Sequence, residues 1–116
     1  MGEWVLDIAV EQIDKVTVVS LSGPIGTSTL EKFKQEVDPL LRKAAPHILL
    51  DCAGLSYINS KGLALLTNYH RRCYADRGRL GLCNVNDRLA KTIELLKLGS
   101  ILKFYGSRDE ALIAMK

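Results

Sequence analysis

The stretch Ile48–Leu66, ILLDCAGLSYINSKGLALL, decides the fold. Ile48-Leu49-Leu50 is an apolar run of strand length that follows Pro46, and Ala53-Gly54 after it is a turn signal. Asn59-Ser60 stands directly before a run with helical spacing, where the N-cap of a helix is expected. The stretch therefore predicts a buried strand, a short turn, and a helix that displays a serine hydroxyl at its positive end.

The residues before this stretch predict a hairpin. Two segments rich in β-branched residues, Val5–Val10 and Val16–Leu21, are separated by the polar residues Glu11–Lys15. Two such segments joined by a short polar loop are typical of antiparallel strands. Ser22–Gly26 contains two glycines and a proline, and we expect it to break the second strand.

A first helix is predicted between the hairpin and the central stretch. The apolar residues from Leu30 to Leu41 have helical spacing. Ser28 and Glu31 have the spacing of a capping box at the start of this helix. Pro39 lies inside it and should kink or split it, because proline lacks the backbone N–H.

The second half of the chain continues to alternate between helix and strand. Gly78 is expected to end the central helix as a C′ glycine, and Leu98-Gly99 to close the next one. Ser107 and Glu110 again have capping-box spacing. The patterns predict a strand over 80–85, a helix over about 88–97, a strand over 103–105 and a helix ending near 115. This order predicts an α/β fold, a mixed sheet of about five strands with about four helices.

The bulk composition is that of a globular domain. The chain has 116 residues, 47% hydrophobic and 25% charged, which suits one compact domain. Its apolar runs are shorter than the roughly 20 residues needed to cross a bilayer, so no membrane insertion is expected. Glu3 and Asp7 lie where an export signal would be basic, and we expect a cytoplasmic protein.

The charge and the cysteines argue against several classes of function. A net charge of +3 is too small to indicate direct nucleic-acid binding. The arginines at 71, 72, 77 and 79 are interpreted as the solvated end of a helix, with an acidic partner surface as the alternative. Cys52, Cys73 and Cys83 lie in apolar runs without metal-ligand spacing, and we expect buried, reduced thiols.

The central stretch resembles the signature of the STAS domain, the fold of bacterial anti-sigma factor antagonists. In that family the corresponding residues read roughly D-(x)3-(V/L)-x-(F/Y)-(I/M)-D-S-(S/T)-G. These places are filled here by Asp51, Leu55, Tyr57, Ile58, Asn59, Ser60, Lys61 and Gly62. The resemblance continues through Leu21–Ile25 and Gly78–Val85, and it implies a single STAS domain over residues 1–116.

The resemblance implies a phosphorylation-switched protein-binding module that is not an enzyme. In anti-sigma factor antagonists the serine at the position of Ser60 is phosphorylated by the anti-sigma factor, which is a protein kinase. The unmodified protein sequesters that kinase and so frees a sigma factor for transcription, and a serine phosphatase resets the switch. From the residues alone, Ser60 has a second interpretation, as the hydroxyl that caps the helix.

The expected partner surface combines the central motif with the glycine-containing loop after the second strand. Two positions depart from the family pattern, because Asn59 replaces an acid and Lys61 replaces a small hydroxyl residue. These departures keep open a constitutive STAS subunit of a lipid-transport ABC complex or of a stress-signalling assembly, and self-association is left open too. The predicted partner-binding residues are Gly23, Pro24, Ile25, Thr27, Ser28, Tyr57, Asn59, Ser60, Lys61 and Gly62.

The sequence argues against two kinds of catalytic or nucleotide site. Asp51 at the end of a buried strand could be the phosphoacceptor of a receiver domain, but the acidic pair that would hold Mg²⁺ is missing after the first two strands. We expect Asp51 instead to hydrogen-bond the turn that follows it. The segment Gly23–Ser28 lacks the lysine of a phosphate-binding loop. No catalytic residue, metal or cofactor is predicted.

Overall fold

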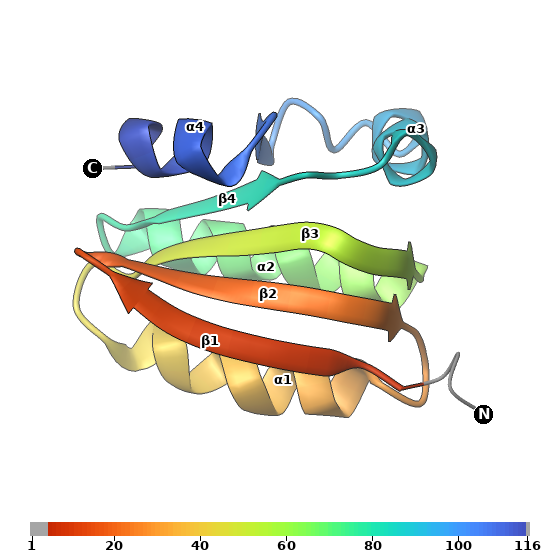
Figure 1. Cartoon of the computed structure of the whole chain (residues 1–116), viewed down its shortest axis with the longest axis horizontal. Helices are drawn as coiled ribbons and strands as arrows, with labels where there is room; N and C mark the ends of the chain where they lie inside the picture. The colour runs from red at the N-terminus through yellow and green to blue at the C-terminus, as the bar shows by residue number, and fades with distance from the viewer. Residues whose placement is uncertain (1–4, 116) are drawn as a thin grey trace.

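The computed structural model describes residues 5–115, which form a five-stranded sheet with the strand order β1-β2-β3-β4-β5. β1 is antiparallel to β2, and the remaining neighbours are parallel (Figure 1). The predicted mixed sheet with alternating helices is confirmed. The elements in chain order are β1 (Asp7–Ile13), β2 (Val16–Ile25), α1 (Leu30–Val37), the 3₁₀-helix η2 (Asp38–Arg42), β3 (His47–Ile58), α2 (Ser60–Ala75), β4 (Arg79–Cys83), α3 (Asp87–Leu95), β5 (Lys103–Tyr105) and α4 (Arg108–Ala114).

The N-terminal hairpin is present, but its second strand is longer than predicted. The register pairs Ile13 with Val16 across a tight turn in which Asp14 has a φ of 54°. β2 does not break at Ser22 but runs to Ile25, because shifts in its register with β3 absorb the irregular residues. The consequence is that β2 and β3 end side by side.

The turn predicted at Ala53-Gly54 does not exist, because β3 continues through these residues to Ile58. The glycine is needed for close packing rather than for a turn. A Cβ at Gly54 would lie 2.9 Å from the backbone oxygen of Leu21 and 3.0 Å from the Cα of Ser22. The glycine therefore lets β2 and β3 approach each other where their register shifts.

The predicted roles of Gly78 and Leu98-Gly99 as helix-ending residues are also wrong. α2 ends at Ala75, and the left-handed residue after it is Arg77, with a φ of 64°. Gly78 follows, and its N–H donates to the carbonyl of Cys73 at 2.7 Å. This is the bond that the C″ residue makes in a Schellman motif, so Gly78 occupies C″ and not C′. A Cβ on Gly78 would lie 1.9 Å from the Pro46 oxygen. In α3 the left-handed residue is Lys97 (φ 60°), so Leu98-Gly99 lies beyond the helix end.

The effect of Pro39 is confirmed. α1 ends at Val37, and the chain continues as the 3₁₀-helix η2, in which the proline occupies the first turn, where its missing N–H costs nothing. The phenol of Tyr69 on α2, which is fully buried, donates to the carboxylate of Asp38 at 2.6 Å. This bond ties η2 to the helix that carries the candidate site.

The two faces of the sheet are covered unequally. The larger core packs α1, η2, α2 and α3 against one face, with Phe33, Leu66 and Ile93 among the buried side chains. The smaller core packs Ala111 of α4 and Met115, the C-cap residue of this helix, against the other face (Figure 1). Within residues 5–115 no helix is both long enough and apolar enough to cross a bilayer.

Candidate functional site

The candidate site is the N-terminus of α2, where the chain leaves β3. Asn59 is the N-cap, and its side-chain oxygen accepts a hydrogen bond from the Gly62 N–H at 2.8 Å. The Asn59 N–H donates to the Ile25 carbonyl at 3.0 Å, which fixes the cap to the end of β2. The interpretation of Ser60 as the helix cap is therefore wrong. Ser60 is the first helical residue and is exposed, and its hydroxyl has no hydrogen-bond partner among residues 5–115.

The ends of two parallel strands support this helix end from below. Ile25 on β2 pairs with Ile58 on β3, and both are buried. Gly62, in the first turn of α2, lies directly on them, since a Cβ there would be 2.7 Å from the Ile58 side chain and 3.0 Å from that of Ile25. Any side chain at position 62 would push the helix end away from the sheet. Gly62 therefore sets how close Ser60 lies to the loops around it.

The loop between β2 and α1 is held by Thr29, which is buried. Its hydroxyl accepts from the Gly26 N–H at 2.9 Å and donates to the Pro24 carbonyl at 2.7 Å. Thr29, not Ser28, is the N-cap of α1, so the predicted Ser28–Glu31 capping box is wrong. Thr29 forms no side-chain cap bond to the helix, because its hydroxyl is used inside the loop. Thr27 and Ser28 are left exposed beside the α2 N-terminus.

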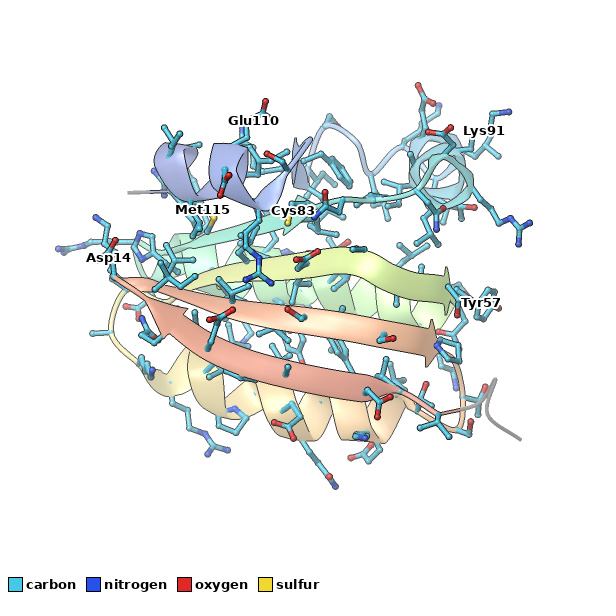
Figure 2. All side chains as sticks on the ribbon, in the orientation of Figure 1. Asp14, Tyr57, Cys83, Lys91, Glu110 and Met115 are labelled. Carbon is cyan, nitrogen blue, oxygen red and sulfur yellow. The ribbon has the colours of Figure 1, made fainter. Side chains whose placement is uncertain are left out.

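Tyr57 stands between two hollows at this end of the sheet. Its side chain is 49% exposed and projects beyond the carboxyl end of β3 (Figure 2). One hollow, of about 620 Å³, is lined by Tyr57 together with Gly26, Thr27, Ser28 and Asn59. The structure thus brings together Thr27, Ser28, Tyr57 and Asn59, which the sequence placed in one surface.

The predicted surface residues do not all reach solvent. Pro24, Ile25 and Gly62 are buried, so they shape the surface from beneath and offer no side chain for direct contact. Gly23, which is half-buried, adopts a φ of 112°, and a Cβ on it would lie 2.1 Å from the Val5 oxygen. Lys61 is exposed next to Ser60, and the first turn of α2 contains no acidic residue.

The sequence did not single out the wall that α3 contributes. A second hollow, of about 440 Å³, lies between the N-terminus of α2 and α3. Arg88, Thr92 and Leu96 line it on the α3 side, and Tyr57 and Ser60 line it on the other. The available signal was the spacing of these three α3 residues, which places them on one helical stripe beside the buried Leu89 and Ile93.

Asp51 belongs to a different polar site, on the sheet face that carries α4. Its carboxylate accepts the predicted hydrogen bond from the Ala53 N–H, at 3.1 Å, although β3 continues where a turn was expected. It also accepts from the Asn84 amide at 3.1 Å and from the Arg108 guanidinium at 3.0 and 3.2 Å. Arg108 in turn binds Glu11 at 2.7 Å and Ser20 at 2.9 Å. Arg108, at the start of α4, is thereby tied to β1, β2 and β3.

The electrostatics of Asp51 fit a structural role. Burial by itself raises the pKa of this carboxyl, but the hydrogen bonds from Asn84, the Ala53 backbone and Arg108 outweigh burial and hold the pKa below its ordinary value. The neighbouring charge is an arginine, where a receiver domain would place carboxylates around a magnesium ion. Within residues 5–115 no group of three or more histidine, cysteine or acidic side chains is arranged to hold a metal.

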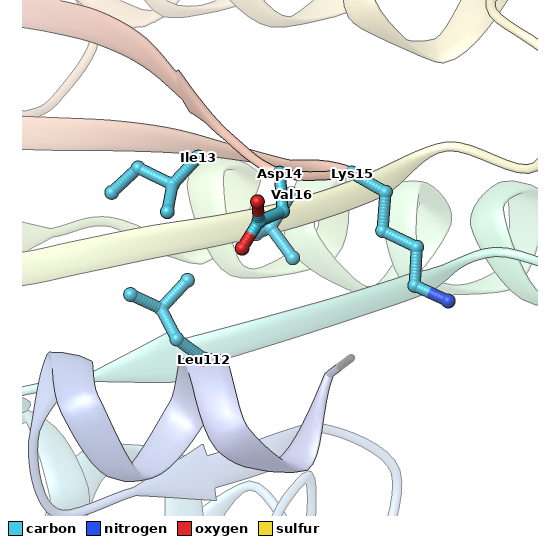
Figure 3. Close-up of a pocket in the computed structure, with 5 residues that line it drawn as sticks. All are labelled: Ile13, Asp14, Lys15, Val16 and Leu112. Atoms are coloured by element: carbon cyan, nitrogen blue, oxygen red, sulfur yellow. The ribbon is translucent and has the colours of Figure 1, made fainter.

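Two further features of the described residues are a hollow beside α4 and three buried cysteines. A hollow of about 380 Å³ lies between the β1–β2 turn and α4, lined by Ile13, Asp14, Lys15, Val16 and Leu112 (Figure 3). It is at the opposite end of the molecule from Tyr57, as the position of Asp14 shows (Figure 2). The three cysteines are free and buried as predicted, and burial raises the pKa of Cys73 and Cys83 to about 11 each.

Comparison with known proteins adds the evolutionary context. The family model described as the STAS domain matches residues 7–111. An anti-sigma F factor antagonist of Paenibacillus polymyxa is 24% identical over 112 residues, 96% of each chain. The crystal structure of an anti-sigma factor antagonist from Mycobacterium paratuberculosis superposes with a TM-score of 0.86 at 25% identity, covering 96% of this chain and 94% of that one. The Bacillus cell fate determinant SpoIIAA in its phosphorylated form superposes with a TM-score of 0.73 at 20% identity, over 95% and 100% of the two chains.

Proposed function

Because this chain belongs to the STAS domain family, we propose that it is an anti-sigma factor antagonist whose binding is switched by phosphorylation of Ser60. The proposal rests on the different roles of two neighbouring side chains at the start of α2. Asn59 satisfies the helix end, and the Ser60 hydroxyl beside it is exposed. A serine that caps nothing is available for another chemistry.

The unmodified protein binds an anti-sigma factor and so releases the sigma factor. The chain itself is not an enzyme in this scheme. The anti-sigma factor is a serine kinase that transfers the γ-phosphoryl group of ATP to the Ser60 oxygen, and ADP leaves. A serine phosphatase hydrolyses the phosphoserine and restores the binding form. Binding need only shift a competition with the sigma factor, which mass action achieves with a few kcal/mol. The proteins meet in the cytoplasm, without direct contact between this chain and nucleic acid.

The position of Ser60 suits a modification that changes binding but not folding. A phosphoryl group adds about −1.5 to −2 charges and three acceptor oxygens. At the first position of a helix this charge interacts favourably with the helix dipole. Lys61, exposed in the same turn, adds a nearby cation. The domain therefore stays folded, while a partner docked on the same surface meets new bulk and new charge.

Relatives support this assignment. The Paenibacillus polymyxa protein, which matches along nearly its whole length, is named an anti-sigma F factor antagonist. SpoIIAA, which shares the fold, has been solved in a phosphorylated form, so at least one domain of this architecture carries the modification in a folded state. The proposal extends that behaviour to Ser60 of this chain.

The experiment is affinity capture from native lysate, with the immobilised chain in the presence and absence of Mg-ATP and with Ser60→Ala as the matched variant. We expect a kinase-type anti-sigma factor to bind the wild type, to be released when Mg-ATP is added, and to be retained by Ser60→Ala. Intact mass of the bait should rise by one phosphoryl group in the wild type alone. Absence of any anti-sigma factor among the bound proteins would refute the proposed function.

A constitutive subunit role is the second candidate, and two residues favour it. Asn59 and Lys61 replace the acid and the small hydroxyl residue that flank the serine in the family pattern. A STAS subunit of a lipid-transport or stress-signalling assembly would bind its partner regardless of ATP. Capture of such subunits, equally by the wild type and by Ser60→Ala, would select this alternative and leave Ser60 unmodified.

A further inference from the structure

The hollow between the N-terminus of α2 and α3, called here the α2–α3 groove, has a mixed wall. Arg88 and Thr92 on α3 and Leu96, its C-cap residue, succeed one another at every fourth position, so they form one stripe along the helix. Hydrogen bonds from the Thr92 hydroxyl to the Arg88 carbonyl and from the Leu96 N–H to the Thr92 carbonyl, at 3.1 and 3.2 Å, hold the stripe in helical form. The wall is therefore preorganised.

The groove exposes apolar surface at its rim. Leu96 is 51% exposed and Tyr57 is 49% exposed, whereas Leu63 and Leu89, which also line the groove, are buried. Half-exposed large side chains around a buried apolar base are typical of a protein contact. Arg88 adds an exposed guanidinium that forms no ion pair with any residue in 5–115.

We infer that the α2–α3 groove receives an apolar side chain of the anti-sigma factor, with a neighbouring carboxylate of the same partner placed on Arg88. The inference deepens the proposed function, on which it rests. The apolar rim favours the apolar side chain. The unpaired guanidinium favours the carboxylate, since arginine binds carboxylates in a bidentate fashion. Tyr57 borders both hollows, so the groove is continuous with the surface around Thr27, Ser28 and Asn59.

The groove also gives the phosphorylation of Ser60 a direct route to release. Ser60 lines the groove from the α2 side, opposite the stripe on α3. A phosphoryl group on its oxygen enters the space that the partner's side chain occupies, and its charge competes for Arg88. Release then follows from occupancy of the groove, without a change in the fold of either helix.

This mechanism can be tested by placing a carboxylate in the groove from the opposite wall. Leu96→Asp introduces it from α3, and Leu95→Asp is the matched control. Leu95 is 82% exposed and lies in the same last turn of the helix, but it does not line the groove. Both variants carry the same penalty for a negative charge near a helix C-terminus, so a difference between them reports on the groove.

Binding of the purified anti-sigma factor that the wild type captures is measured by titration calorimetry. We expect Leu96→Asp to bind at least about tenfold more weakly, like Ser60→Asp, and Leu95→Asp to stay within about twofold of the wild type. Arg88→Ala should bind about three- to tenfold more weakly, with a reduced dependence on salt. Lys91→Ala, on the outer side of the same helix (Figure 2), should have no effect.

The outcomes separate the inference from the proposed function. If Leu96→Asp and Arg88→Ala bind like their controls while Ser60→Asp is weakened, the groove assignment is overturned and the switch stands. If Leu96→Asp is weakened and Ser60→Asp is not, the groove stands and the switch falls. If the wild type binds no anti-sigma factor, both are overturned. Thermal unfolding of Leu96→Asp beside Leu95→Asp excludes a folding defect as the cause.

Discussion

Two polar side chains, Asp51 within β3 and Ser60 just beyond its carboxyl end, have opposite surroundings. Asp51 is 9% exposed and accepts hydrogen bonds from Ala53, Asn84 and Arg108. Ser60 is exposed at the start of α2 and caps nothing. In the sequence both looked like candidates for phosphorylation, since an acid after a buried strand and a serine before a helix are both found as phosphoacceptors.

The difference shows how hydrogen bonding separates a structural role from a functional one. A polar group whose hydrogen-bonding capacity is fully used serves the fold, whereas a polar group without partners is free for another function. Both oxygens of the Asp51 carboxylate are occupied, one by Ala53 and Asn84 and the other by Arg108 at the start of α4. A new covalent group there would break several contacts at once. The Ser60 hydroxyl can be modified without loss of any contact within residues 5–115. Replacement of Asp51 should therefore lower the free energy of unfolding, whereas replacement of Ser60 should leave it nearly unchanged.

Replacement of Asp51 should have the largest effect. Asp51→Ala removes the acceptor for four donor groups and leaves the Arg108 guanidinium without its most buried partner. We expect the free energy of unfolding to fall by about 2–3 kcal/mol, measured by urea titration with circular dichroism. Glu11→Ala is the control, because Glu11 is an exposed partner of the same arginine, and its loss should cost at most about 1 kcal/mol. Equal losses in the two variants would contradict the structural role of Asp51.

Replacement of Asn59 should have an intermediate effect. Asn59→Ala removes the side-chain oxygen that accepts from the Gly62 N–H. Loss of a helix N-cap costs about 1 kcal/mol, and the same urea titration measures it. Asn59→Asp keeps the acceptor and should retain most of the stability. If Asn59→Ala left the free energy of unfolding unchanged, the Ser60 hydroxyl would be able to replace the Asn59 oxygen as the cap. The contrast between a capping side chain and a free hydroxyl would then fail.

The sequence predicted the order of elements because apolar runs and helical spacing are local properties. It failed where a residue is chosen by a distant part of the chain. Gly54 and Gly78 looked like turn and helix-end residues, but they are glycines because the backbones of Leu21 and Pro46 approach them. A local pattern contains no information on such an approach, since the contact exists only once the sheet has formed.

The candidate site was predictable to the same extent. Thr27, Ser28, Tyr57 and Asn59 were placed in one surface, and they line one hollow. The choice between Asn59 and Ser60 as the cap could not be made from sequence, because both residue types cap helices well. The α3 wall was missed because its stripe becomes part of the site only through the packing of α3 beside α2.

Asp51 should also make the free energy of unfolding depend on pH, by less than the loss expected for Asn59→Ala. A carboxyl whose pKa is lower in the folded state stabilises the fold above its unfolded pKa, and that contribution is lost as the pH falls through the folded pKa. Since the pKa of Asp51 is lower in the fold than in the unfolded chain, the advantage of wild type over Asp51→Asn should shrink as the pH falls through the ordinary range of an aspartate pKa. Urea unfolding of both proteins across this range measures it. A constant difference would mean that folding does not lower the pKa of Asp51.

Replacement of Ser60 should have the smallest effect on stability and the largest on regulation. Ser60→Ala removes a hydroxyl that has no partner within residues 5–115, and alanine is the better helix former. The free energy of unfolding should therefore stay within about 0.5 kcal/mol of the wild type, as measured by the urea titration used for Asp51→Ala. The same variant should lose all phosphorylation by the captured kinase, which intact mass reports. A loss of stability as large as that of Asn59→Ala would place the hydroxyl in the helix cap. Ser60 would then resemble Asp51, a polar group already committed to the fold.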